Sequence, residues 1–378
     1  MRDKLCVLFV LIILLAGCGG APASPTASPT TAVPVTTSVP SITVPPTAVP
    51  STALPPTPGA TRPPLVTVDV DPSRYIDNRS DAVAVLQSLY NAINRKEYVR
   101  AYSYWEAGAA ATFLPPYAQF EQGYSNTVAV ALSVGPVSGD AAAGSLYYAV
   151  PVGLRATLTS GATQTFAGCY VLHLGQPENY GAPPFRSMAV QSAAIQQVAE
   201  DADLAGLAAQ ACQELGVAES PVPPVQTPPP DDVSAAYYID DRSGPAEVMQ
   251  SFYNAINRKE YVRAYSYWEE SAAVAFLPPY PQFEQGYSTT VSAQLTTGEV
   301  SSDAGAGQLY YYVPAALVAI QTDATARTFV GCYTLQLGQP SFQGAPPFQP
   351  LAIVAADVRE VANDADLETE LGTACPSD

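Results

Sequence analysis

The sequence predicts an α+β protein made of two tandem copies of one unit, in which a helical hairpin packs on an antiparallel β-sheet. The first observation is an internal repeat: Tyr75 to Cys212 matches Tyr238 to Cys375 at a constant offset of 163 residues, with 82 of 138 positions identical. The second and third are apolar residues at helical spacing early in each unit, followed by stretches that alternate with a period of two. A repeat this long indicates duplication of a whole domain.

The first part of each unit predicts two helices. Ser80 is the expected N-cap of a helix with apolar residues three and four positions apart, and Pro245 lies where the first turn of the second copy tolerates proline. A break at Asn94-Arg95 leads to a second, shorter helix that ends near Trp105. The two helices form a hairpin, and a brief helical piece is expected over 119–123.

The period of two begins after this helical part. It predicts a short strand over 127–134, a long strand over 146–158, a turn at Ser160-Gly161, and a returning strand over 166–174. A loop rich in glycine and proline precedes a last strand over 187–195. The unit ends in a polar helical tail that carries Cys212.

The N-terminus has the pattern of an export signal. Leu5 to Ala16 form an apolar run of 12 residues, which is shorter than the roughly 20 residues that a membrane-spanning helix needs. Leu15-Ala16-Gly17-Cys18 resembles the lipobox of bacterial lipoproteins, and the alternative is an ordinary secretory signal that contains a cysteine. The resemblance implies a lipid on Cys18 that anchors an extracytoplasmic protein to the cell membrane.

Composition divides the rest of the chain. Residues 18–66 are rich in proline, threonine and serine, cannot form a core, and are expected to be a disordered, extended stalk. A shorter proline-rich stretch recurs over 216–236. The predicted organisation is a signal peptide over 1–17, the stalk over 18–66, repeat 1 over 67–215, the linker over 216–236 and repeat 2 over 237–378.

Each repeat carries two cysteines at matching positions. Four cysteines allow three pairings, and the duplication favours the pairing confined to each repeat, Cys169 with Cys212 and Cys332 with Cys375. A metal site is the competing interpretation. Two cysteines per repeat, without a histidine that both repeats share, supply too few ligands for tetrahedral zinc.

The order of elements, together with the stretch Leu89-Tyr90-Asn91-Ala92-Ile93-Asn94, resembles the nuclear transport factor 2-like superfamily of cystatin-like cone folds. Tyr98, Ala101, Tyr102 and Trp105 carry the resemblance further, and it covers about 75–212 and 238–375. It implies a strongly curved sheet around a cone-shaped cavity. This fold hosts isomerases, dehydratases, hydrolases and plain binding modules, so the resemblance does not by itself select a function.

The charged residues disfavour several functions. A net charge of −18 repels phosphate backbones, so nucleic acid is not an expected partner. Catalytic members of the superfamily place a carboxylate in the cavity as general base. The acids in question lie at predicted element ends and favour a solvated role, and the single histidine, His173, has Gln336 as its counterpart, which favours a surface strand position. These acids are Glu106, Glu121 and Asp140, with equivalents Glu269, Glu284 and Asp303.

The expected protein therefore has no catalytic residue, metal or cofactor, and its tandem domains bind a ligand or partner at the cell envelope. Expected partners are the membrane, through the lipid, and a glycan, a peptide or an envelope protein. The alternatives are an isomerase or dehydratase that uses a cavity carboxylate, and a structural envelope-assembly protein. The candidate ligand pocket consists of aromatic residues that recur in both repeats: Tyr90, Tyr98, Tyr102, Trp105, Tyr148 and Tyr170, with Tyr253, Tyr261, Tyr265, Trp268, Tyr311 and Tyr333.

Overall fold

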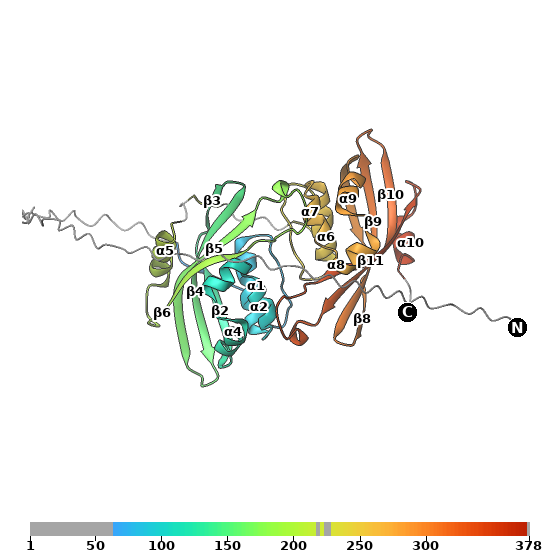
Figure 1. The fold of residues 1–378 in the computed structure, drawn as a ribbon. Coiled ribbons are helices and arrows are strands. Elements are labelled where there is room, and N and C mark those ends of the chain that lie inside the picture. Colours follow the sequence, from blue (N-terminus) through green and yellow to red (C-terminus); the bar gives the residue numbers. More distant parts are fainter. Residues whose placement is uncertain (1–62, 217–219, 223–227, 376–378) are drawn as a thin grey trace, which may run out of the picture. The chain divides into compact units, whose positions relative to one another are not determined.

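The computed structural model describes residues 63–216, 220–222 and 228–375, all of which belong to one compact unit, Pro58–Asp378. The signal peptide, Cys18 and the stalk up to residue 62 lie outside the described residues. The described chain is a mixed α+β structure with antiparallel sheets, which confirms the predicted fold class at that level (Figure 1).

Four helices precede the main strands of repeat 1: α1 (Ala82–Asn94), α2 (Tyr98–Ser103), α3 (Ala107–Phe113) and α4 (Tyr117–Gly123). The expected N-cap of α1 was wrong by one residue. The Asp81 side chain accepts hydrogen bonds from the backbone N–H groups of Val83 and Ala84, which caps the helix. The Ser80 hydroxyl instead accepts a hydrogen bond from the backbone N–H of Asp240.

The strands of repeat 1 form one antiparallel sheet in the order β1-β2-β4-β5-β6, with β3 paired to β4. They are β1 (Val66–Val68), β2 (Thr127–Val134), β3 (Ser138–Ala142), β4 (Ser145–Leu158), β5 (Thr163–Gly175) and β6 (Ala189–Val198). A short 3-10 turn, η1 (Pro177–Asn179), follows β5, and α5 (Leu204–Glu214) follows β6. Helix α1 contacts β2 and β4, whereas α5 lies on β4 and β5 (Figure 1).

Repeat 2 reproduces this arrangement, except that its sheet has no strand equivalent to β1 in the described residues. Its helices are α6 (Pro245–Asn257), α7 (Tyr261–Tyr265), α8 (Glu270–Phe276), α9 (Tyr280–Gly286) and α10 (Leu367–Gly372), with the 3-10 turn η2 (Pro340–Phe342). Its strands are β7 (Thr290–Thr297), β8 (Ser301–Gly305), β9 (Gln308–Gln321), β10 (Ala326–Gly338) and β11 (Ala352–Val361). Their order is β11-β10-β9-β7, with β8 paired to β9.

The described parts of the proline-rich linker are held against both repeats. Val233 is 4% exposed and belongs to the core of repeat 2, so the expected disorder does not apply to residues 228–236. Residues 220–222 lie against repeat 1. The backbone N–H of Gly139 donates to the carbonyl of Ser220, and the N–H of Val222 donates to the carbonyl of Val137. The expected disorder therefore does not apply to residues 220–222. Strand β1 also begins one residue before the predicted start of repeat 1 at residue 67.

A buried arginine joins the first two helices to the segment that precedes them. Arg100 on α2 is fully buried and pairs with Glu97, while its Nη2 donates to the amide oxygen of Asn91 on α1 at 2.9 Å. Its Nη1 donates to the carbonyl of Ile76. Arg263 makes the equivalent contacts in repeat 2, so both repeats fix their helices with the same network.

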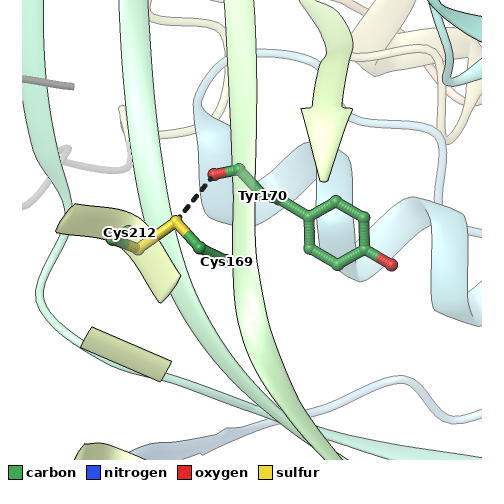
Figure 2. Close-up of a disulfide and its surroundings, with 3 residues drawn as sticks. All are labelled: Cys169, Tyr170 and Cys212. Atoms are coloured by element: carbon green, nitrogen blue, oxygen red, sulfur yellow. Dashed lines mark hydrogen bonds between the residues drawn. A yellow bond between two sulfur atoms is a disulfide. The ribbon is translucent and has the colours of Figure 1, made fainter. Parts of the chain in front are cut away.

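Each repeat contains its predicted disulfide. Cys169 on β5 joins Cys212 on α5, and Cys332 on β10 joins Cys375 after α10. Neighbouring residues of a strand point to opposite faces of the sheet. Figure 2 shows the Cys169–Cys212 bridge on one side of β5 and the ring of Tyr170 on the other. The bridge therefore fixes α5 to the face of the sheet opposite to the tyrosine.

The two repeats also contact each other through matching residues. The backbone N–H of Asp77 donates to the Ser243 hydroxyl at 2.9 Å, and the N–H of its equivalent Asp240 donates to the Ser80 hydroxyl at the same distance. Between them, the Asn78 side-chain amide donates to Asp241 at 2.7 Å. Equivalent residues of the two repeats thus make reciprocal contacts, as in a two-fold symmetric interface. The central pair departs from the symmetry, because its two equivalent positions hold Asn78 and Asp241.

We predict that the first disulfide stabilises repeat 1 substantially. Replacing both Cys169 and Cys212 with alanine should lower the free energy of unfolding by about 4 kcal/mol, because the bridge closes a long loop in the unfolded chain. Urea unfolding followed by circular dichroism measures this change. Peptide mass spectrometry without reduction checks the pairing, and a peptide that links Cys169 to Cys375 would contradict it.

We predict that Arg100→Met destabilises the protein by about 3–5 kcal/mol, because the substitution removes the buried partner of the Glu97 carboxylate and leaves it only the partly exposed Arg95. The matched control is Arg155→Met, since the Arg155–Glu200 pair is solvent-exposed and should contribute about 1 kcal/mol or less. Equal losses of unfolding free energy in the two variants would show that the buried network stabilises the protein no more than an exposed ion pair does.

The central carboxylate between the repeats predicts a pH dependence. Burial is the main cause that raises the pKa of Asp241 to about 7; the neighbouring Glu247 and Asp77 contribute to the rise, and hydrogen bonds from Ser243 oppose it. A carboxyl group with a raised pKa in the folded state binds a proton on folding. It therefore stabilises the fold at low pH, and that contribution disappears as the pH rises from about 4 to about 7.

Asp241→Asn should remove this contribution, so that the difference in unfolding free energy between the parent chain and the variant changes over this pH range. Asp303→Asn is the control, because Asp303 is exposed. A difference that stays constant from pH 4 to pH 8 for Asp241→Asn would contradict the assignment. Chemical denaturation at a series of pH values provides the measurement.

Candidate functional site

The helices and the sheet of repeat 1 enclose a cavity of about 390 Å³. Helix α1 contributes Leu89 and Tyr90, and Trp105 follows α2. Strand β5 contributes Tyr170, from the face of the sheet opposite to the disulfide (Figure 2). The remaining lining residues come from α3, α4 and the strands, and every one is uncharged: Phe113, Leu114, Phe120, Gly123, Tyr124, Thr127, Val130, Leu154, Ala156, Gln164, Phe166, Ala193 and Ile195.

Two tyrosines of this lining, Tyr90 and Tyr170, are hydrogen-bonded to each other. The Tyr90 and Tyr170 hydroxyls lie 2.7 Å apart, and their rings meet edge to face. Burial raises the pKa of Tyr90 well above its usual range and that of Tyr170 to about 12. Both groups are therefore neutral at physiological pH. Since each hydroxyl can donate one hydrogen bond and accept others, the pair can serve a ligand as donor and as acceptor.

Aromatic rings form much of the wall around this pair. The ring of Trp105 meets Tyr170 edge to face with centroids 6.1 Å apart, and it also contacts Phe113. Phe113 is 47% exposed, which places it where the cavity wall meets solvent. Aromatic residues supply large apolar area in a fixed geometry, so this wall suits a flat or apolar ligand.

Three of the predicted pocket residues of repeat 1 line the cavity and three do not. Tyr90, Trp105 and Tyr170 are brought together. Tyr98 stacks on Tyr124 with centroids 6.1 Å apart, and Tyr102 packs edge to face on Phe120 and Tyr117. These two tyrosines therefore support the wall from behind.

Tyr148 lies elsewhere, on the wall of a separate cavity of about 450 Å³ that Ser80 and Met188 also line. A long strand can border two cavities, one near each of its ends. The alternation of a sequence predicts the face of the sheet on which a residue lies, but not which of the two cavities it lines.

The tyrosines of repeat 2 keep the ring contacts of their equivalents, whereas Trp268 does not reproduce the ring contacts of Trp105. The hydroxyls of Tyr253 and Tyr333 are hydrogen-bonded, and Tyr261 stacks on Tyr287. Tyr265 packs on Tyr280 and Phe283, and Tyr311 packs against the core of the repeat. Trp268 is 8% exposed, and its indole N–H is buried without a hydrogen-bond partner.

The acids and the histidine take other positions. Glu121, Asp140, Glu284 and Asp303 are exposed, in agreement with their expected solvated role. Glu269 accepts a hydrogen bond from the backbone N–H of Ala272 and so caps α8.

His173 is half-buried rather than a simple surface residue, because its Nδ1 pairs with Glu106 and its ring stacks on Tyr147 at 4.9 Å. Gln336 replaces this histidine in repeat 2, so the Glu106–His173 pair belongs to repeat 1 alone. Neither residue lines the cavity.

The sequence did not indicate several lining residues. Phe113 and Leu114 lie on or after α3, a helix whose alanine-rich sequence has no apolar stripe. Gln164 and Thr127 lie at strand ends, where alternation does not define a face. Pro115 and Pro116, which end the helical region, were the one sequence feature that pointed to a chain reversal next to Leu114.

Within residues 63–216, 220–222 and 228–375, no three histidine, cysteine, aspartate or glutamate side chains are grouped as a metal site would require. No helix in this described part is both long enough and apolar enough to span a membrane. Structural disulfides persist in oxidising compartments, so the two bridges indicate an extracytoplasmic location.

Comparisons with protein families, with curated proteins and with solved structures found no match to this chain.

Proposed function

We propose that the chain is an exported bacterial lipoprotein, anchored through Cys18, whose tandem nuclear transport factor 2-like domains form a non-catalytic binding module at the cell envelope. The observation that carries this proposal is the uncharged, aromatic cavity of repeat 1, whose lining includes the hydrogen-bonded pair Tyr90 and Tyr170. Binding sites for small ligands are concave and mostly apolar, with a few placed polar groups.

The lining indicates the class of ligand. Neither an acid nor a base faces the cavity, so a charged group would be desolvated there without compensation. The walls favour an uncharged ligand that combines an apolar part with hydrogen-bonding groups, since Thr127 and Gln164 line the cavity as well as the tyrosine pair. An isomerase or dehydratase of this superfamily would instead need a carboxylate in the cavity, and the uncharged lining supports binding over that alternative.

The anchor and the proline-rich segments fit this role. A lipid on Cys18 would keep the domains at the membrane, and the stalk would hold them away from its surface. The ligand is therefore expected among components of the envelope: the apolar part of a lipid-linked glycan, an apolar peptide, or a neutral lipid.

Titration with Nile red, an uncharged and largely apolar dye that carries a carbonyl, tests the proposal. The mature chain with Cys18→Ser needs no detergent and should bind the dye with a blue-shifted emission. Tyr170→Phe should weaken binding about 2- to 10-fold, as expected for one lost hydrogen bond. Tyr148→Phe is the matched control and should bind normally, since Tyr148 does not line this cavity.

Competition then identifies the class of natural ligand. Lipid extracts of the envelope, soluble glycan fragments and peptide digests are added separately to the dye complex, and displacement is followed by the emission. Displacement by one class supports the proposal. Absence of dye binding by the folded chain, or equal binding by all variants, would contradict it.

A further inference from the structure

The two repeats differ at few of the positions that line the repeat 1 cavity. The tyrosine pair, the tryptophan and most of the wall are identical, whereas four lining residues of repeat 1 change in repeat 2. In the order of repeat 1 and then repeat 2, these are Leu89 and Phe252, Val130 and Ala293, Gln164 and Arg327, and Ile195 and Val358. We propose that these changes close the cavity of repeat 2, so that the chain binds one ligand, in repeat 1; this inference rests on the proposed function.

The first change places an aromatic ring where repeat 1 has an aliphatic side chain. Phe252 is 2% exposed, and its ring meets that of Tyr253 edge to face with centroids 4.8 Å apart. Tyr253 belongs to the hydroxyl pair of repeat 2, so the ring of Phe252 packs directly beside that pair.

Two opposing changes make room for this ring. Val130 becomes Ala293 on β7, and Ile195 becomes Val358 on β11, so that the sheet loses bulk where the helix gains it. Interiors pack at nearly constant density, and exchanges that conserve volume are tolerated best. The ring adds three carbon atoms on the helix side and the two sheet positions lose three, so these exchanges move bulk toward Tyr253 without adding to it. Closure of the site therefore depends on the fourth change.

The fourth change lies over the wall. Where repeat 1 has Gln164, repeat 2 has Arg327, whose guanidinium lies 5.1 Å from the ring centroid of Phe329. Arg327 donates two hydrogen bonds to Glu360, at 3.0 and 2.6 Å. Phe329 is the equivalent of the lining residue Phe166, so this ion pair covers a ring that repeat 1 leaves free of a cation.

The tryptophans report the result of these changes. Trp105 is half-buried on the wall of an open cavity, whereas Trp268 is 8% exposed and its buried N–H has no acceptor. An unpaired buried donor costs about 1–3 kcal/mol, and a water molecule relieves it only where the site has room and further polar partners. An N–H group that is buried without an acceptor is expected where a site has closed and has no room for a water molecule.

The chain has two tryptophans, one in each repeat, so each site can be observed alone. Trp268→Phe leaves Trp105 as the only indole, and Trp105→Phe leaves Trp268. Acrylamide, an uncharged quencher, should quench Trp105 several-fold more strongly than Trp268. Equal quenching would overturn the inference without any statement about ligands.

Exchange of the ring between repeats provides the decisive variants. Leu89→Phe should protect Trp105 from acrylamide and strongly weaken Nile red binding, because without smaller residues at Val130 and Ile195 the ring adds three carbon atoms to the cavity. Phe252→Leu combined with Arg327→Gln should expose Trp268 and raise the stoichiometry from one dye per chain to two. Thermal unfolding by circular dichroism confirms that the variants fold.

The outcomes separate this inference from the proposed function. Two dyes bound per parent chain, or undiminished binding by a folded Leu89→Phe variant, would overturn the inference and leave the binding function intact. Different quenching of the two tryptophans, with no dye bound by any folded variant, would support the closed second site and contradict the binding function.

Discussion

The buried guanidinium of Arg100 is the interaction on which the helical half of repeat 1 depends, and Arg263 has the same role in repeat 2. A buried charge is tolerated only when it is paired and fully hydrogen-bonded. Arg100 meets this condition with Glu97, Asn91, the hydroxyl of Tyr104 and the carbonyl of Ile76. Because these partners lie on α1, on α2 and before α1, the network fixes the angle between the helices. That angle places Tyr90 and Trp105 on the same cavity wall.

Local patterns predicted most of the secondary structure, and their failures have physical reasons. The alternation over 127–134 matches β2, and the helical spacing before Asn94 matches α1. Helix α3 was missed because its run of alanines has no apolar stripe, and β3 was missed because it is short and mostly exposed. Ser80 and Asp81 are both good capping residues, and the choice depends on a contact with Asp240 that lies 160 residues away.

The cavity was harder to predict than the fold. Spacing shows that Tyr90, Trp105 and Tyr170 face inward, but it does not show whether the space between them is filled. That depends on a few atoms: the repeats share the tyrosine pair and the tryptophan, and differ at positions such as Leu89 and Phe252. A pattern of apolar and polar residues does not distinguish leucine from phenylalanine. In a densely packed interior the two side chains differ in size and shape, and so in the space that they leave.

The duplication also explains where the repeats were free to diverge. Two identical copies that met through the segment around residue 78 would place like residues opposite each other. Two aspartates at that centre would repel, and the Asn78–Asp241 pair replaces this repulsion with a hydrogen bond. The arginine network and the disulfide, which join elements within each copy, are retained in both repeats, while four positions of the cavity lining differ.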